Sequence, residues 1–131
     1  MLHRKHCPGS PEDWLMHARS DLSLAGISAP EDVLLEGLCF HAQQAAEKAL
    51  KALFISYKID FPRTHNIGTL LDLLSEILPI PESVEESASL TDYAVLTRYP
   101  GEMEPVDDDE YEQALLLAQN VLEWVSQQLE R

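Results

Sequence analysis

Residues 31–58 contain no proline and only one glycine, and this stretch constrains the fold more than any other part of the chain. Between positions 42 and 53, five alanines and two leucines alternate with glutamine, glutamate and lysine, which is a strongly helix-forming composition. The sequence therefore predicts a long helix over about residues 31–57. At about 100° per residue, one face of this helix collects Leu34, Leu35, Leu38, Ala42, Ala45, Ala46, Ala49, Ala52 and Leu53.

A second row of side chains lies on roughly the opposite face of the same predicted helix. A buried helix face does not require polar groups in this row, and a fully solvated face does not require an aromatic ring. The row therefore indicates a polar groove or a contact between subunits. Its members are Phe40, Gln44, Glu47, Lys51 and Lys58.

Capping and breaking residues divide the remaining sequence into four further helices. Ser10 followed by Pro11 is a typical helix start. Pro79 and Pro81 end one helix, and Pro100 disfavours helical geometry at the residue before it. The predicted helices cover about residues 10–27, 31–57, 67–78, 82–98 and 107–131.

These elements predict an all-α fold. No segment alternates with a period of two, so no strand is expected. Five helices with short connections form an antiparallel bundle, in which Thr64 or Asn66 caps the third helix. A chain of 131 residues is large enough for one core. We expect a flexible tail over residues 1–9 and a single helical domain over residues 10–131.

The charge is strongly negative and unevenly distributed. Nine lysines and arginines stand against 23 aspartates and glutamates, which gives a net charge of −14. Residues 66–131 carry fifteen of the acids and two of the bases. Because backbone neutralisation needs several clustered bases, charge does not favour a broad RNA-binding face. A local basic pocket and a basic partner protein remain compatible with this pattern.

Composition also limits the location and the cofactors. No apolar run approaches the 18 or so residues of a membrane span, and the basic N-terminus lacks the apolar stretch of a secretory signal. We expect a cytoplasmic protein whose Cys7 and Cys39 are reduced thiols. His3, His6 and Cys7 do not make a preformed metal site, and no metal or other cofactor is expected.

Three motifs resemble those of the HEPN-domain family. The first is Phe40–Leu53, which is similar to the central helix of that family. The second is Pro62–Ile67, which is similar to the segment that follows that helix. The third leads from Leu90 and Tyr93 to Arg98-Tyr99-Pro100 and resembles the family's Arg-Tyr-Pro signature. The likeness covers about residues 12–128 and implies a HEPN-like up-and-down bundle.

The resemblance also implies a function. Small stand-alone HEPN proteins often act with a minimal nucleotidyltransferase, in a module that resembles a toxin–antitoxin pair. The first hypothesis is therefore a homodimer that binds a nucleotide or another phosphate-bearing ligand in a cleft and associates with such a partner. Tyr93 and Tyr99 are expected near the two-fold interface. The alternatives are a metal-independent endoribonuclease toxin and a purely structural interaction module.

Arg98 is the first candidate for ligand binding, because arginine makes two-pronged contacts with phosphate. Its alternative role is a structural one, as an ion-pair partner or a base at the end of a helix. In the ribonuclease signature a histidine follows this arginine by four to six residues, but here the window contains none. Because histidine is the usual acid or base near neutral pH, the protein is not expected to be a catalyst alone.

His65 is the candidate replacement for the missing histidine, so Arg98 and His65 are the catalytic candidates if RNA is cleaved. His65 lies beside Arg63 at a predicted helix start, which favours an anion, although it can instead bond the local backbone. Glu47, Lys48 and Lys51 have a second reading as solvated helix pairs. The predicted ligand-binding residues are Arg98, Tyr99, Lys51, Lys48, Glu47, Gln44, Arg63 and His65.

Overall fold

The computed structural model describes residues 7–94 and 104–130, and every regular element in these ranges is a helix. The elements are α1 (Pro11–Ala25), α2 (Leu35–Ser56), α3 (Ile67–Ser75), α4 (Glu82–Glu85), the 3₁₀ helix η1 (Glu86–Tyr93) and α5 (Asp108–Leu129). The predicted all-α class is confirmed. Arg98, Tyr99, His3 and His6 lie outside the described residues.

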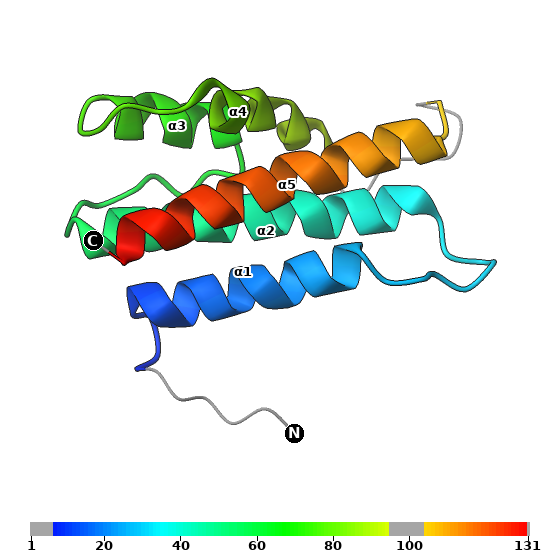
Figure 1. Cartoon of the computed structure of the whole chain (residues 1–131), viewed down its shortest axis with the longest axis horizontal. Coiled ribbons are helices and arrows are strands. Elements are labelled where there is room, and N and C mark those ends of the chain that lie inside the picture. Colours follow the sequence, from blue (N-terminus) through cyan, green and yellow to red (C-terminus); the bar gives the residue numbers. More distant parts are fainter. Residues whose placement is uncertain (1–6, 95–103, 131) are drawn as a thin grey trace.

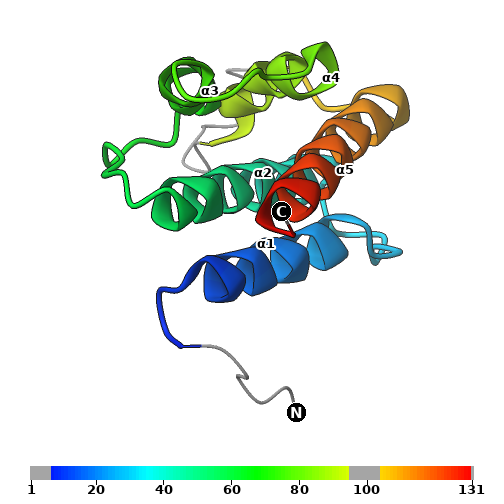
Figure 2. The same ribbon diagram turned by 60° about the vertical axis from the view of Figure 1, so that its left-hand side comes forward.

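The three long helices α1, α2 and α5 form the body of the bundle (Figure 1). α2 packs against both α1 and α5, and α1 runs antiparallel to the other two (Figures 1 and 2). α3, α4 and η1 form a shorter layer on the side of α2 and α5 that faces away from α1. α2 is therefore the central helix of the fold, and side chains on its different faces meet different neighbours.

The predicted N-terminal caps of α1, α3 and α5 are confirmed. The side chain of Ser10 accepts a hydrogen bond from the backbone N–H of Asp13, and Asp107 accepts one from Glu110. Of the two candidates for the third helix, Asn66 is the N-cap, since its side chain accepts from the N–H of Thr69. Each cap satisfies an N–H group that has no partner within its own helix.

The predicted start of the second helix is wrong by four residues. The carbonyl of Pro30 accepts from the N–H of Val33 in a turn, and Leu34 is an extended N-cap residue with no side-chain cap. The residues after Pro30 thus make a turn before α2 begins at Leu35. Leu34, predicted on the apolar face, is 72% exposed because it precedes the helix.

The helix predicted over residues 67–78 is shorter than expected, and the one predicted over 82–98 differs in type within residues 82–94, while residues 95–98 lie outside the described part of the chain. α3 ends at Ser75, and the N–H groups of Ile77 and Leu78 both bond to the carbonyl of Leu74. After α4 the chain tightens into η1. There the hydroxyls of Ser87 and Ser89 bond to carbonyls three residues earlier, and such bonds compete with the α-helical ladder.

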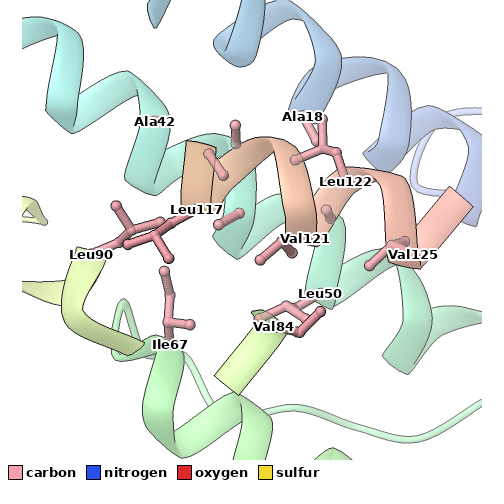
Figure 3. Close-up of a cluster of buried hydrophobic side chains, with 14 of the residues drawn as sticks. Ala18, Ala42, Leu50, Ile67, Val84, Leu90, Leu117, Val121, Leu122 and Val125 are labelled. Atoms are coloured by element: carbon pink, nitrogen blue, oxygen red, sulfur yellow. The ribbon is translucent and has the colours of Figure 1, made fainter. Parts of the chain in front are cut away.

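The hydrophobic core confirms the predicted apolar face of α2 from Leu38 to Leu53. Alanines of α2 are fully buried and allow close helix approach. Figure 3 shows how the other elements close over this face: Ile67 and Leu90 meet Leu117, while Val84 lies near Leu50. Among the described residues, no helix is both long and apolar enough to cross a membrane.

Lys58, predicted in the polar row of the second helix, lies beyond the end of α2. It is the one non-glycine residue with positive φ among the described residues, at 57°. Because glycine avoids the Cβ strain of this geometry, Lys58→Gly should raise the free energy of unfolding by roughly 0.5–1 kcal/mol. Urea denaturation checks this, and Ser56→Gly inside α2 should change stability in the opposite direction.

Candidate functional site

Three polar side chains lie one turn apart on α2 and are buried. Gln43, Glu47 and Lys51 expose 0%, 3% and 7% of their surface. This burial contradicts the alternative reading of Glu47 and Lys51 as a solvated helix pair. They are covered because the segment after α2 folds back over them, which helical periodicity does not reveal.

Glu47 is the centre of this group, which we call the Glu47 hub and define as Gln43, Glu47, Lys51 and His65. Lys51 Nζ donates to Glu47 Oε2 at 2.8 Å. Gln43 Nε2 donates to Glu47 Oε1 at 3.0 Å, and His65 Nδ1 lies 2.9 Å from the same oxygen. One carboxylate thus bonds to three side chains from two segments of the chain.

Gln43 connects the hub to the backbone and to the edge of α2. Its Nε2 also donates to the carbonyl of His65 at 3.0 Å, and its Oε1 accepts from Gln44 Nε2 at 2.7 Å. The buried amide of Gln43 therefore has hydrogen-bond partners for both its nitrogen and its oxygen. It was not among the residues predicted from sequence. Its spacing of four residues from Glu47 was the available signal.

The electrostatics keep Glu47 ionised. Burial alone would raise the pKa of Glu47, but hydrogen bonds from Lys51, Gln43 and His65, together with the charge of Lys51, outweigh it. The pKa of this carboxyl group therefore lies below its ordinary value. At neutral pH the group is a carboxylate, which only accepts hydrogen bonds.

This lowered pKa predicts an acid-dependent loss of stability. A depressed pKa stabilises the fold above the unfolded-state pKa of about 4.5, and that contribution is lost as pH falls through the lower folded-state pKa. Urea denaturation between about pH 7 and pH 3 should show a steeper decline for the wild type than for the charge-free Glu47→Leu/Lys51→Met variant. Equal slopes would contradict the assigned direction.

His65 and Arg63 lie in the exposed segment between α2 and α3. The side chain of His65 is 69% exposed although its Nδ1 is bonded to the buried Glu47, and Arg63 is exposed. The alternative that the His65 ring bonds the local backbone is not what the structure shows. The helix start beside it is already occupied, since Thr91 Oγ1 accepts from the N–H of Ile67 and Asn66 Oδ1 accepts from that of Thr69.

Aromatic rings hold this segment against the bundle. Phe61 meets Trp14 of α1 and Phe54 of α2 edge to face, with ring centroids 5.8 and 5.7 Å apart. The ammonium of Lys51 lies 5.3 Å from the centroid of the Phe61 ring. Phe61 therefore helps to cover the hub and fixes where Arg63 and His65 emerge.

A second polar group joins α1 to α2. Asp21 of α1 is buried, and its two oxygens lie 3.1 Å from His41 Nδ1 and 2.6 Å from Lys48 Nζ. Lys48 is thus engaged in a partly buried ion pair between α1 and α2. Three of the predicted ligand-binding residues are therefore bonded within the protein: Lys51 to Glu47, and Lys48 to Asp21. A fourth, Gln44, is partly exposed and bonds to Gln43.

A third group lies where α2 and α5 begin. The hydroxyl of Tyr93 donates to Glu110, and the N–H of Val106 donates to Glu36 at 2.6 Å. Burial, reinforced by Glu110 and Glu36, raises the pKa of the Cys39 thiol to about 11, so this thiol stays protonated and unreactive near neutral pH. Burial and the bond to Glu110 also raise the pKa of Tyr93.

No group of three or more histidine, cysteine, aspartate and glutamate side chains in residues 7–94 and 104–130 is arranged to hold a metal ion. In the segment between α2 and α3, the exposed ring of His65 is suited to hydrogen bonding and proton exchange, and Arg63 is suited to binding an anion.

These observations define the class of the protein: it is an all-helical bundle whose central helix carries a buried polar hub. A family model described as the HEPN domain matches residues 11–129. The chain therefore belongs to the HEPN-domain family, as its motifs indicated.

Solved structures share the helical fold of this chain. A protein from Thermus thermophilus is 36% identical, with a TM-score of 0.73 over 89% of this chain and 96% of the other. An archaeal HEPN homologue is 29% identical, with a TM-score of 0.72 over 91% and 97% of the two chains. A HEPN domain protein from Thermotoga maritima is 25% identical, with a TM-score of 0.59 over 92% and 94%. No curated protein sequence matches this chain.

Proposed function

We propose that this HEPN-domain protein binds a nucleotide or another phosphate-bearing ligand at the surface that carries Arg63 and His65, and that it acts with a minimal nucleotidyltransferase. The observation that carries the proposal is the tethering of an exposed imidazole to a buried, ionised carboxylate. A bundle gains little stability from such an arrangement at its surface, whereas a binding site benefits from a pre-oriented polar group.

The remaining ligand contacts depend on which lysine and arginine side chains are not already bonded to a carboxylate of the protein. Lys48 and Lys51 donate to Asp21 and Glu47, so they support the surface rather than meet a phosphate. Arg63 is exposed beside His65. In the proposal Arg98 supplies the two-pronged phosphate contact and Tyr99 a stacking surface, as the family motif suggests.

The proposed partner is a protein with a basic surface. The net charge is −14, and exposed acids occur along α5, including Asp109, Glu112 and Glu123. Opposite charge steers association and selects partners. Within this proposal the protein is a homodimer, and the pair with the nucleotidyltransferase resembles a toxin–antitoxin module.

The ribonuclease remains the second candidate because a specific observation favours it. His65 bonded to Glu47 has the form of a general base held by a carboxylate, and no histidine follows Arg98. Metal-independent cleavage of RNA that is lost in His65→Gln would establish this activity. Absence of cleavage would leave ligand binding as the function to test.

Calorimetry with ATP and AMP tests the proposed binding. Arg98→Ala and Arg63→Ala should each weaken the affinity by about tenfold to a hundredfold, the range for a charge-assisted hydrogen bond. Arg19→Ala is the matched control, because Arg19 is an exposed arginine of α1 that bonds to Ser126. Equal losses in all three variants would indicate a general charge effect, and no heat of binding in the wild type would overturn the proposal.

A further inference from the structure

The two ring nitrogens of His65 differ in their hydrogen bonding. Nδ1 lies 2.9 Å from Glu47 Oε1, whereas Nε2 has no hydrogen-bond partner among the described residues. Glu47 bonds to three donors, and its pKa is lowered. An ionised carboxylate has no hydrogen to give, so the hydrogen between the two groups belongs to Nδ1.

The surrounding contacts give this bond a fixed direction. Lys51 occupies the other carboxylate oxygen at 2.8 Å, and Gln43 holds both Glu47 Oε1 and the carbonyl of His65 at 3.0 Å. The imidazole is therefore attached to α2 through its ring and through its own backbone. The ring cannot turn Nε2 toward Glu47 without breaking the bond between Nδ1 and Glu47.

We propose that Glu47 is a positioning residue that fixes neutral His65 in the tautomer with its hydrogen on Nδ1, so that Nε2 faces a ligand as a hydrogen-bond acceptor. The hydrogen bond at one ring nitrogen selects the state of the other. An acceptor of this kind fits a ligand hydroxyl, such as that of a ribose, rather than a fully ionised phosphate. The use of Nε2 by a ligand rests on the proposed function, but the tautomer does not.

Nitrogen NMR of the full chain labelled with ¹⁵N-histidine tests the inference at a pH where His65 is neutral. The chain has five histidines, so the signals that disappear in His65→Gln identify the residue. In the wild type, Nδ1 of His65 should carry the hydrogen and Nε2 should not. A wild-type ring with its hydrogen mainly on Nε2 would overturn the inference without any further variant.

Two variants separate the effect of the Glu47 carboxylate on the His65 tautomer from any effect of a less stable hub. Glu47→Leu/Lys51→Met removes the acceptor and its countercharge together, and the preference for the Nδ1 hydrogen should be lost. Lys51→Gln removes the same charge but keeps the carboxylate and a donor to it, and the preference should persist. Loss in both variants, or in neither, would assign the tautomer to something other than Glu47.

His41 provides an internal control in every spectrum. Its Nδ1 lies 3.1 Å from Asp21 Oδ1, and its signals should be unchanged in the variants of the hub if the bundle is intact. Addition of ATP then addresses the proposed function separately. Unchanged His65 signals at saturating ATP would count against ligand binding at this surface, whatever the tautomer.

Discussion

Glu47→Leu should lower the free energy of unfolding by about 3 kcal/mol, because it leaves the buried ammonium of Lys51 without its counterion. Removing one partner of a buried ion pair costs about 3–5 kcal/mol, and the lower end applies here since the side chain of Lys51 keeps 9% of its surface in solvent. Urea denaturation at neutral pH measures the loss.

The double variant Glu47→Leu/Lys51→Met is the control for this prediction. It removes both charges, and apolar replacements of similar volume are often neutral. We therefore expect it to be more stable than Glu47→Leu alone. If the double variant is no more stable than Glu47→Leu alone, Glu47 and Lys51 do not act as a pair, and the hub is held together by Gln43 and His65 instead.

Phe54→Ala should also destabilise the protein by about 3–5 kcal/mol, the usual cost of truncating a buried phenylalanine. Phe54 is fully buried and supports the Phe61 ring, which in turn covers Lys51. The variant should therefore loosen the segment with Arg63 and His65 in addition to opening a cavity. Thermal denaturation and hydrogen exchange of the backbone of residues 57–66 measure the two effects.

Leu116→Ala is the matched control for Phe54→Ala. Leu116 lies on α5 and is 49% exposed, so truncation should change stability by less than about 0.5 kcal/mol. A similar loss in both variants would mean that the α5 surface is covered in solution. A small loss in Phe54→Ala would contradict the position of this ring in the core.

The two predictions share a physical basis. The Phe61 ring covers Lys51 on one side of the hub, and Phe54 and Trp14 pack against that ring. The apolar surroundings strengthen the bonds around Glu47. The stability of the bundle and the orientation of His65 are thereby connected. A change in the core should reach the candidate site through Phe61.

The family and the helical class could be predicted from sequence because the signals are local. Ser10 and Asp107 cap helices within three residues of themselves, and the alanines of α2 recur with the helical period. Local signals were weaker at Pro30 and around Ser87, where a turn and a 3₁₀ helix replace predicted α-helix. A backbone bond from Val33 to Pro30 decided the conformation at the turn, and bonds from serine hydroxyls to backbone carbonyls favoured the 3₁₀ helix.

The sequence by itself determined that α2 is a helix with an alanine-rich core face and a row containing Glu47 and Lys51. Only the tertiary structure decided that Glu47 and Lys51 of this row are buried and that Glu47 is bonded to His65. Periodicity gives the direction of a side chain around its own helix, but not which distant segment covers it. That depends on Phe61 packing against α1 and α2, and this contact brings His65 to within 2.9 Å of Glu47.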